Sequence, residues 1–589
     1  MMSMNSEKRR QQAAVLLSEM QQQTMLAGGG RLVTACPGAG KTRSVGARAA
    51  VLDADGLRVA LVTYTNVAAD EMRGTLARDY GARLADQHYV GTLHSFLLKY
   101  VFRPFSHLVM GCSVPPAVRV ESGERFLRFK EHRLALDDFE FHVDSSLTFE
   151  GRYPNGLFLK RAALSEAMRA EATAGKVEEA RSGVVQVDEA MYWCMLTLEK
   201  FPDVRSAVAA RFDEIIVDEA QDTSGFQIEC LRLIAGAGLS SLFLVGDFDQ
   251  SIYEFKGASR KSCLGLASQI GLVEYRLTEN HRSSQRICNV AANFRGLETP
   301  DSAVGPAANA NIQPSVMLYE PERLALIPDD FSSYLKQFEI SPSHGAVIAR
   351  NNRLLDSLSG RPSRPGFTPS IRLCLDVARL DHQAPALRQL RNLEDLIVNV
   401  AFGEAQASRT VERSESLRDA AMFVVDNLPP SEGLLGEWVN SATSIIVSAA
   451  QLVGGDAGVR DRISTRLRIS ATNAELPLEE AVQPGRSDGL RLDTIHGVKG
   501  MSIGGVLLVV DHVERYDGAL QADEWASAIR RQTESKAQHV ADEELRIVYV
   551  ALTRAERVCR LAIPSDTSVA TLEAFRSVGF TVEGLDVSA

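Results

Sequence analysis

Short apolar runs rich in Val, Ile and Leu recur along the chain, and turn residues or polar residues bound each of them. Such runs are typical of strands that flanking helices bury on both faces, so they predict a parallel α/β sheet architecture. We expect strands at residues 32–35, 59–64, 215–217, 242–245, 347–349 and 506–510.

Two stretches of different character lie between these runs. Within 105–195, a partly alternating run from Phe139 to Phe149 ends in turn residues at 151–156, which predicts a small hairpin inside a helical insertion. A turn-rich break at 360–366 precedes a second stretch that ends near residue 485. In it, apolar residues recur at helical spacing at Leu390, Leu393, Ile397 and Val400, and again at Leu435, Trp438, Val439, Ala442 and Ile446. We therefore expect mainly helical insertions at 105–195 and 361–485.

Length and composition agree with a multidomain α/β protein. The 589 residues leave room for about three to five domains. Apolar residues make up 45% and charged residues 24%, which is typical of folded globular proteins and excludes wholesale disorder. The formal net charge is −11. Any contact with nucleic acid must therefore come from local grooves rather than from the overall field.

The eight cysteines are scattered, without a CxxC pair or a Cys/His cluster at ligand spacing. This pattern argues against structural zinc, iron–sulfur clusters and a disulfide framework. The N-terminus does not combine a basic start, an apolar run and a small-residue cleavage site, and apolar stretches such as 505–510 are only strand-sized. We expect a cytoplasmic protein with reduced thiols and no membrane partner.

The expected strand at 32–35 runs into ACPGAGKT at residues 35–42, which has the A-x-x-x-x-G-K-T spacing of a phosphate-binding loop. In such a loop the backbone N–H groups, here of Gly38, Ala39 and Gly40, curl around phosphates at a helix N-terminus. Lys41 would reach the β- and γ-phosphates of a nucleotide, and Thr42 would ligate Mg²⁺. The alternative is a chance match of a strand, a turn and a helix.

The expected strand at 215–217 is followed by DEAQD at residues 218–222. This places carboxylates at the carboxyl edge of the sheet, where Asp218 would hold the metal and Glu219 would orient or deprotonate water. The alternative is the ordinary preference of acidic residues for a helix N-terminus. The phosphate-binding loop upstream favours the metal site.

Further motifs follow in a characteristic order. They are VTYTNVAADEM at 62–72, GTLHSF at 91–96, GDFDQSIYEFKGA at 246–258, LTENHRS at 277–283, AVIAR at 346–350, TIHGVKG at 494–500 and YVALTRA at 549–555. Together with the two motifs above, this order resembles the UvrD/Rep/PcrA-like superfamily 1A DNA helicases. The motifs span about residues 20–565, whereas the two insertions match the family only in position and approximate size.

The resemblance implies two RecA-like α/β domains whose interface holds ATP. Domain 1A would comprise 1–104 and 196–280, and domain 2A would comprise 281–360 and 486–589. The insertions at 105–195 and 361–485 would be subdomains 1B and 2B.

The resemblance also implies roles for single residues at the ATP site. Lys41, Thr42 and Arg43 would bind the triphosphate and Mg²⁺, and Gln250 would sense the γ-phosphate. Arg282 and Arg554 would act from the opposite domain as arginine fingers on developing charge.

Recognition of the nucleoside is where the sequence departs from the family. Gln21 stands where the family uses a glutamine to read adenine, although Gln22 and Gln23 are equivalent candidates and a solvated helix face is the alternative. His281 replaces a tyrosine that stacks on adenine. Ser502 replaces a glutamate that accepts a hydrogen bond from the ribose 3′-hydroxyl, so we expect loose recognition of the sugar.

Candidate DNA contacts come from the same motifs. Tyr64 and Phe255 occupy positions where the family stacks aromatic rings on bases, although either ring could simply pack in a core. The expected contacts to the DNA backbone are Asn66, Thr92, His94, Lys256, Arg350, Thr494, His496 and Lys499. Of these, Lys256 stands where the family has an arginine, and His94 and His496 could equally be structural imidazoles.

The function implied by the resemblance is an ATP-dependent helicase or translocase that needs Mg²⁺ and moves 3′ to 5′ on single-stranded DNA or a tailed duplex. The alternative is a regulatory ATPase subunit that senses DNA and switches a partner nuclease without processive unwinding. The run at 494–502 and the compact length are also similar to the short helicases of two-gene anti-phage systems such as Gabija. In those systems the helicase-like subunit accompanies an OLD-family ATPase–nuclease, so the similarity implies such a partner. The segment after Pro564 is too short for the nuclease domain that some members of the family carry.

Overall fold

A computed structural model describes residues 7–583, apart from 9, 13–14, 27, 82–86, 120–125, 130–131, 153–157, 164, 249–259, 359–367, 379–386, 403–414, 431–432, 457, 470–473, 476, 479–488, 496, 499, 511–521 and 535–542. The chain divides into two compact units. One unit comprises Met1–Val101, Cys194–Pro362 and Arg486–Ala589, and the other comprises Phe102–Trp193 and Ser363–Gly485.

The first unit contains two six-stranded parallel sheets. The strands of the first sheet lie in the order β13-β1-β12-β11-β2-β3. Their bounds are Val273–Leu277 for β13, Arg31–Ala35 for β1, Ser241–Gly246 for β12, Glu214–Val217 for β11, Val59–Thr63 for β2 and Tyr89–Thr92 for β3. All four strands predicted for the first part of the chain therefore lie side by side in this sheet.

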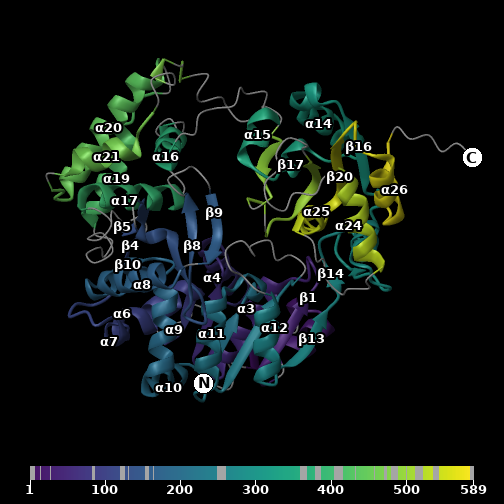
Figure 1. The fold of residues 1–589 in the computed structure, drawn as a ribbon. Coiled ribbons are helices and arrows are strands. Elements are labelled where there is room, and N and C mark those ends of the chain that lie inside the picture. The colour runs from purple at the N-terminus through teal and green to yellow at the C-terminus, as the bar shows by residue number, and fades with distance from the viewer. Residues whose placement is uncertain are drawn as a thin grey trace, which may run out of the picture. The chain divides into compact units, whose positions relative to one another are not determined.

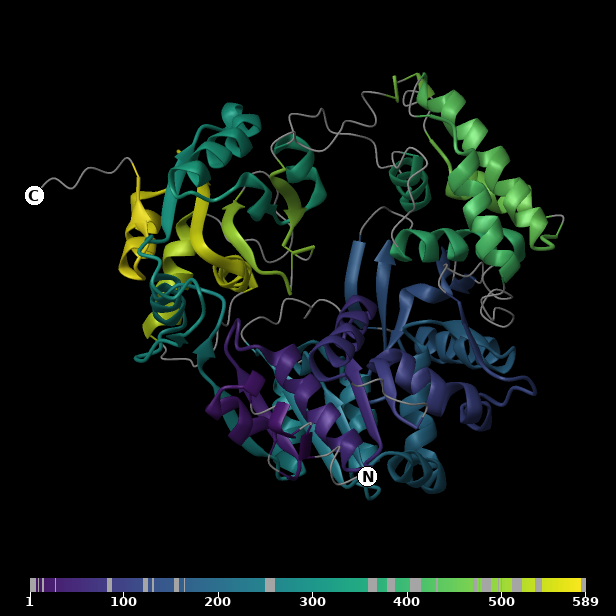
Figure 2. The same ribbon diagram turned by 180° about the vertical axis from the view of Figure 1, so that it is seen from behind.

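Helices cover both faces of the first sheet. Helices α3 (Lys41–Ala54) and α4 (Asn66–Tyr80) pack against each other, and α11 (Gly225–Ala235) packs against α10 (Pro202–Arg211) and α12 (Arg260–Gln269). Figure 1 views the sheet from the side of α11 and α12, and Figure 2 views it from behind. Alternate residues of the strands, such as Val33, Ile216 and Phe243, share one core with α3 and α4. Burial on both faces explains why the strands read as continuous apolar runs.

The second sheet has the order β18-β17-β19-β20-β16-β21, and all of its neighbouring strands are parallel. The bounds are Arg491–Thr494 for β18, Gly345–Ala349 for β17, Ile503–Val509 for β19, Ala555–Pro564 for β20, Ser315–Tyr319 for β16 and Thr581–Val582 for β21. The last two predicted strands correspond to β17 and β19. The two sheets confirm the α/β prediction.

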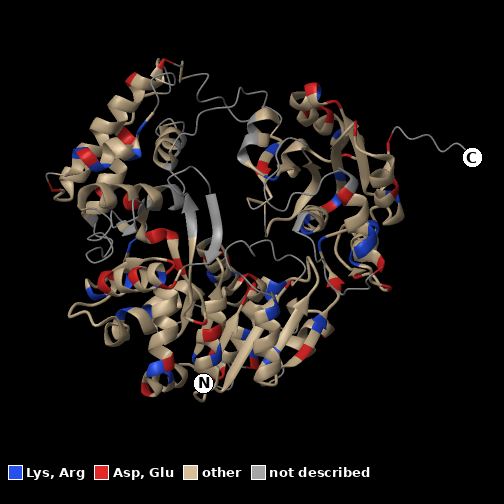
Figure 3. Cartoon of the chain, viewed as in Figure 1, with Lys and Arg blue, Asp and Glu red and all other residues tan. Residues whose placement is uncertain are grey.

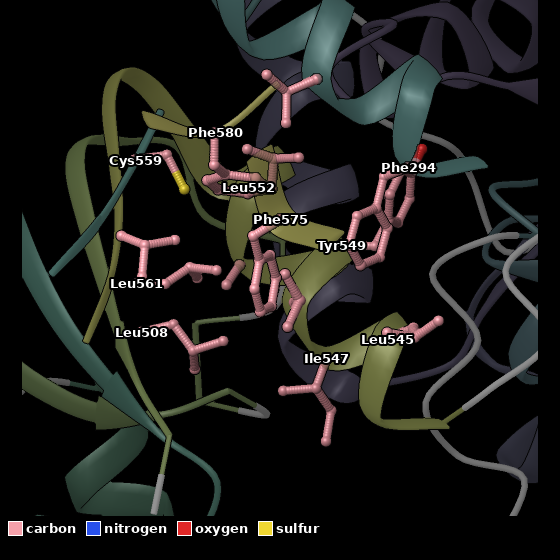
Figure 4. Close-up of a cluster of buried hydrophobic side chains, with 14 of the residues drawn as sticks. Phe294, Leu508, Leu545, Ile547, Tyr549, Leu552, Cys559, Leu561, Phe575 and Phe580 are labelled. Carbon is pink, nitrogen blue, oxygen red and sulfur yellow. The ribbon is translucent and has the colours of Figure 1, made fainter. Parts of the chain in front are cut away.

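The core on one face of the second sheet is rich in aromatic side chains. It is formed with helices α13 (Gln285–Arg295), α24 (Ala522–Glu534), α25 (Glu543–Arg554) and α26 (Val569–Ser577). Figure 4 shows Phe294, Tyr549 and Phe575 from three of these helices gathered against Leu508 and Leu561 of the sheet. On the opposite face, α14 (Ile327–Gln337) and α15 (Asn352–Leu358) contribute to a second core. Helix α25 is buried in the first of these two cores from Leu545 to Leu552.

The segment Phe102–Trp193 contains more strands than the sequence pattern predicted. Strand β7 (Phe139–Phe141) pairs antiparallel with β8 (Leu147–Arg152), which confirms the hairpin, and β9 (Phe158–Ala163) extends it. Two further pairs are β5 (Phe126–Phe129) with β6 (His132–Ala135), and β4 (Ala117–Arg119) with β10 (Val184–Gln186). The longest described helix of this segment is α8 (Glu166–Arg181), which lies between β9 and β10 in the chain. The expectation of a mainly helical insertion was wrong here, because strands of three to six residues are too short to show a clear period-2 pattern.

The segment Ser363–Gly485 is helical where the structure describes it. Its helices are α16 (Pro369–Ala378), α17 (Leu387–Phe402), α19 (Glu415–Asn427), α20 (Leu435–Leu452) and α21 (Val459–Arg466). The apolar residues that predicted two of them, in α17 and α20, are buried in a single core. The predicted helical insertion is therefore confirmed in this segment.

The charged residues carry no strong bias along the described chain. Figure 3 shows Lys and Arg residues interspersed with Asp and Glu residues on its helices. No helix in the described ranges combines the length and the apolar character needed to cross a lipid bilayer.

Candidate nucleotide site and strand-binding edge

The phosphate-binding loop lies between β1 and α3, at the carboxyl edge of the first sheet. Gly38 and Gly40 have φ angles of 73° and 70°, in the left-handed region that favours glycine. A Cβ atom on Gly38 would lie 2.6 Å from the Cβ of Arg282 and 2.6 Å from the Oδ1 of Asn280. Only glycine fits where these two residues approach the loop. Lys41 is the first residue of α3, so the backbone N–H groups of the helix start face the loop.

The carboxylates of DEAQD lie at the same edge, after β11, which is separated from β1 only by β12. Asp218 is buried, with 4% of its surface exposed. Burial and the neighbouring charge of Glu219 raise the pKa of Asp218 to about 7, although Lys41 opposes this shift. A divalent cation at this position would favour the ionised form of Asp218, because its positive charge stabilises the carboxylate. The carboxylate in turn supplies the oxygen ligand that Mg²⁺ prefers. A hydroxyl and a carboxylate are oxygen donors of the kind that Mg²⁺ prefers, so the chemistry of Thr42 and Asp218 fits this ion.

No cluster of three or more His, Cys, Asp or Glu side chains suited to a metal occurs among the described residues.

Arg282 and Arg554, which belong to the domain built around the second sheet, lie near the carboxyl edge of the first sheet. Arg554 ends α25 and is buried, and Arg282 follows β14 (Glu279–Asn280). Burial lowers the pKa of both guanidinium groups, while the charges of Asp247 and Glu219 act in the opposite direction on both. The structure thus brings Arg282 and Arg554 within electrostatic range of the carboxylates that follow β11 and β12.

Asn280 is a residue of this site that the sequence reasoning missed. Its Oδ1 accepts hydrogen bonds from the backbone N–H groups of Arg282 at 2.8 Å and Ser283 at 2.9 Å. The hydroxyl of Ser283 in turn donates to the carbonyl oxygen of Ala555 at 2.7 Å. These bonds fix the turn that carries Arg282. An asparagine before His-Arg-Ser is a recognisable signal for such a turn, because its side chain readily bonds the backbone two residues on.

Gln21 lies in helix α2 (Glu19–Met25), which begins with a capping box between Ser18 and Gln21. The Nε2 of Gln21 donates to the carbonyl oxygen of Ala39 at 2.8 Å, so this side chain reaches the phosphate-binding loop. Gln22 and Gln23 instead donate within or beside their own helix, to the carbonyl oxygen of Leu17 and to the carboxylate of Glu19.

His281 lies next to Gln21 at the loop. Its backbone N–H donates to the carbonyl oxygen of Gly38 at 2.9 Å, and its Nε2 lies 3.5 Å from the Nε2 of Gln21. Burial lowers the pKa of His281, and Arg43 lowers it further, whereas Glu279 raises it. A neutral imidazole is therefore favoured at neutral pH, and such a ring could stack on a base.

The candidate DNA contacts of the first sheet domain lie on strands further along the same edge. Tyr64 follows β2 and is partly exposed, and Asn66 begins α4 and is exposed. Thr92 ends β3, where Thr63 is its partner in the neighbouring strand. It also caps α5 (Leu93–Leu97), which contains His94, by accepting a hydrogen bond from the N–H of Ser95. This cap gives Thr92 a structural role of its own.

In the second sheet domain, Arg350 follows β17 and Thr494 ends β18, where it is paired with Ala349. In each sheet the candidates thus cluster at the carboxyl ends of two adjacent strands. Gln250, Phe255, Lys256, His496 and Lys499 lie outside the described residues.

A phosphate-binding loop, a buried acidic strand end and two facing arginines define a P-loop NTPase with two parallel-sheet domains. Residues 17–270 match the UvrD/REP helicase N-terminal domain. YjcD of Bacillus subtilis, a candidate ATP-dependent DNA helicase, is 24% identical over 91% of this chain and 77% of its own length. The ATP-dependent DNA helicases PcrA of Leuconostoc citreum and Rep of Escherichia coli are 29% and 27% identical over 44% of this chain.

The chain is therefore similar to UvrD/REP-type helicases, and its two parallel-sheet domains are RecA-like. It spans 36% of the length of PcrA and 40% of the length of Rep.

Proposed function

We propose that this protein is an ATP-dependent DNA helicase or translocase that moves 3′ to 5′ on single-stranded DNA. The observation that carries the proposal is the approach of Arg282 and Arg554, from the second RecA-like domain, to Glu219 and Asp247 at the edge of the first. A nucleotide on the loop at Gly38–Lys41 would lie between the two domains, so its hydrolysis could change how they grip DNA.

In this proposal the loop residues Gly38, Ala39 and Gly40, with Lys41 and Arg43, bind the triphosphate, and Gln21 and His281 contact the base. Thr42 and Asp218 would hold Mg²⁺, which would neutralise charge on the β- and γ-phosphates when bound. Glu219 accepts a proton from the attacking water, and Gln250 senses the γ-phosphate. Arg282 and Arg554 stabilise the charge that develops on the transferred phosphoryl group.

The strand-binding edge would hold DNA mainly through its backbone. Tyr64 and Phe255 would stack on bases, and a stack of this kind contributes about 1 to 3 kcal/mol without requiring a particular sequence. Asn66, Thr92, His94, Lys256, Arg350, Thr494, His496 and Lys499 would contact phosphates and sugars. In the same scheme 1–104 with 196–280 is domain 1A, 281–360 with 486–589 is domain 2A, and 105–195 and 361–485 are subdomains 1B and 2B.

An unwinding assay on tailed duplexes tests the proposal. With ATP and Mg²⁺ the protein should separate a duplex that has a 3′ single-stranded tail and leave one with a 5′ tail paired, and Glu219→Gln should separate neither. Hydrolysis of ATP without strand separation on either duplex would favour the alternative, a DNA-sensing regulatory ATPase. Separation of the 5′-tailed duplex alone would contradict the proposed polarity.

The cellular setting in this proposal is anti-phage defence, with DNA repair as the other setting. It rests on the similarity of residues 494–502 to the short helicases of two-gene systems, which also implies an OLD-family ATPase–nuclease partner. Purification of the protein from its native operon should bring a nuclease with it, and a gene without a nuclease neighbour would count against the partner.

A further inference from the structure

Gln221 is the centre of a buried network between two motifs of the first RecA-like domain. Its side chain has no exposed surface. The Nε2 donates to the Oε2 of Glu219 and approaches the Oδ2 of Asp222 at 3.4 Å. The Oε1 accepts a hydrogen bond from the backbone N–H of Asp247 at 3.1 Å. One amide group therefore joins the carboxylate that follows β11 to the backbone that follows β12.

The space around this amide is closed by the backbone of β12. A Cβ atom on Gly246 would lie 2.4 Å from the Oε1 of Gln221 and 3.3 Å from its backbone nitrogen. The glycine is needed here for close approach, because a side chain would displace the amide. The position of Gln221 is thus fixed by packing as well as by hydrogen bonds.

Glu219 needs such support because its backbone is strained. It has φ 54° and ψ 43°, in the left-handed region, and only two other non-glycine residues among the described ones have positive φ. A residue held in this region persists only when the surrounding structure fixes it, and such residues concentrate at functional sites. The contact from Gln221 holds one carboxylate oxygen of Glu219 in place.

The chemistry of the neighbours explains why an amide is suited to this position. Glu219, Asp222 and Asp247 all carry carboxylates, and Asp218 is adjacent. A neutral donor can join them without adding another negative charge, whereas a carboxylate of the same shape would repel Glu219 and lose the donor group.

We propose that Gln221 is a positioning residue that orients Glu219 toward the attacking water and ties that orientation to the backbone after β12. The inference rests on the proposed role of Glu219 as the group that accepts a proton.

The test compares Gln221→Met, which keeps the length of the side chain and removes its hydrogen bonds, with wild-type protein. The kcat for DNA-stimulated ATP hydrolysis should fall about tenfold or more, because a small misplacement of a catalytic group has effects of this size. The KM for ATP and the melting temperature should change little. Gln221→Glu, the isosteric change that removes the donor, should lower kcat at least as much.

Gln227→Ala is the matched control. Gln227 caps α11 through Ser224 in the same segment of chain, and the bonds of its side chain are to that cap. This variant should keep the wild-type kcat. An equal loss of kcat in Gln227→Ala and Gln221→Met would show that loosening of the segment, not the orientation of Glu219, is responsible.

A double-mutant cycle separates positioning from a merely structural role. In a Glu219→Gln background, Gln221→Met should cause no further loss of the residual rate, because the group that it positions is already gone. Losses that multiply in the double variant would overturn the proposal, and so would a kcat for Gln221→Met near that of the wild type. If Gln221→Met does not fold, Gln221→Asn, shorter by one methylene, replaces it in the same cycle. Wild-type protein without DNA-stimulated hydrolysis would instead contradict the proposed function itself.

Discussion

The Nε of Arg282 donates a hydrogen bond to the Oγ of Ser502 across 2.8 Å. The same guanidinium donates through Nη1 to the carbonyl oxygen of Thr553 at 3.0 Å, and Thr553 directly precedes Arg554. Two contacts therefore hold Arg282 beside the second arginine of the site. Ser502 stands where the family has a longer, charged residue, so its hydroxyl has a partner here other than the nucleotide sugar.

Loss of the Ser502 hydroxyl should weaken catalysis more than binding. In Ser502→Ala, Arg282 loses one of its two orienting contacts, and a hydrogen bond to a charged group contributes about 1.5 to 3 kcal/mol. We expect kcat for ATP hydrolysis to fall about three- to tenfold with little change in KM. Ser502→Thr keeps the hydroxyl and should retain most of the activity. A wild-type kcat in Ser502→Ala would show that the contact does not position Arg282.

Recognition of the ribose should be loose. A serine is shorter than the glutamate of the family and is neutral. Because Ser502 already accepts a hydrogen bond from Arg282, it is poorly suited to accept a second one from the ribose 3′-hydroxyl. We therefore expect 3′-deoxy-ATP to be hydrolysed nearly as efficiently as ATP. The measurement is kcat/KM for both nucleotides, and a preference for ATP above about tenfold, or about 1.4 kcal/mol, would contradict this expectation.

Tyr64 should be needed for the response to DNA more than for hydrolysis itself. Its ring is partly exposed at the end of β2, which β12 and β11 separate from the loop strand β1 in the sheet. In Tyr64→Ala the stimulation of ATP hydrolysis by single-stranded DNA should fall strongly while the rate without DNA is kept, and Phe255→Ala should behave alike. Equal loss of both rates would identify these aromatic rings as core residues.

His88 should make the first RecA-like domain sensitive to acid. Its side chain is buried, the Nδ1 accepts a hydrogen bond from the N–H of Val59 at 3.1 Å, and the Nε2 lies 3.0 Å from the Oδ1 of Asp53. Burial lowers the pKa of His88 from 6.5, although Asp53 opposes this and Arg211 assists it. Because the unfolded chain then binds a proton more readily than the folded one, the free energy of unfolding should decrease as pH falls below 6.5.

Urea unfolding at about pH 8 and about pH 5.5 measures this effect. His88→Gln should be less stable at the higher pH, where the wild-type imidazole makes both contacts, and should lose less stability on acidification. An identical loss in wild type and variant would show that other groups cause the acid sensitivity.

Most of the fold was predictable because burial on two faces leaves a local signal. The runs at 32–35, 215–217 and 242–245 fall within strands of the first sheet, and the helical spacing of Leu435 to Ile446 falls within α20. The short strands of 105–195 were not predictable in the same way. Phe139 and Phe149 pack ring to ring across their hairpin, but β5 and β6 show no comparable pattern in the sequence.

The functional residues of the site were predictable only where they belong to a recognisable sequence motif. The contact between Arg282 and Ser502 joins residues 220 positions apart, and the network of Gln221 depends on a glycine in another strand. The raised pKa of Asp218 follows mainly from its burial, which cannot be inferred from the residues next to it in the sequence. Such features arise from tertiary packing, so a sequence alone could name the residues but not their partners.

ATP hydrolysis at this site should be under the control of DNA, and the steady-state ATPase rate with and without single-stranded DNA at saturating Mg²⁺ tests this most directly. We expect a low rate without DNA and a much higher rate with it. Lys41→Ala should abolish both rates, Glu219→Gln should leave only a small residual rate, and both variants should keep the melting temperature of the wild type. Equal wild-type rates with and without DNA, or a rate that survives in Lys41→Ala, would contradict the account.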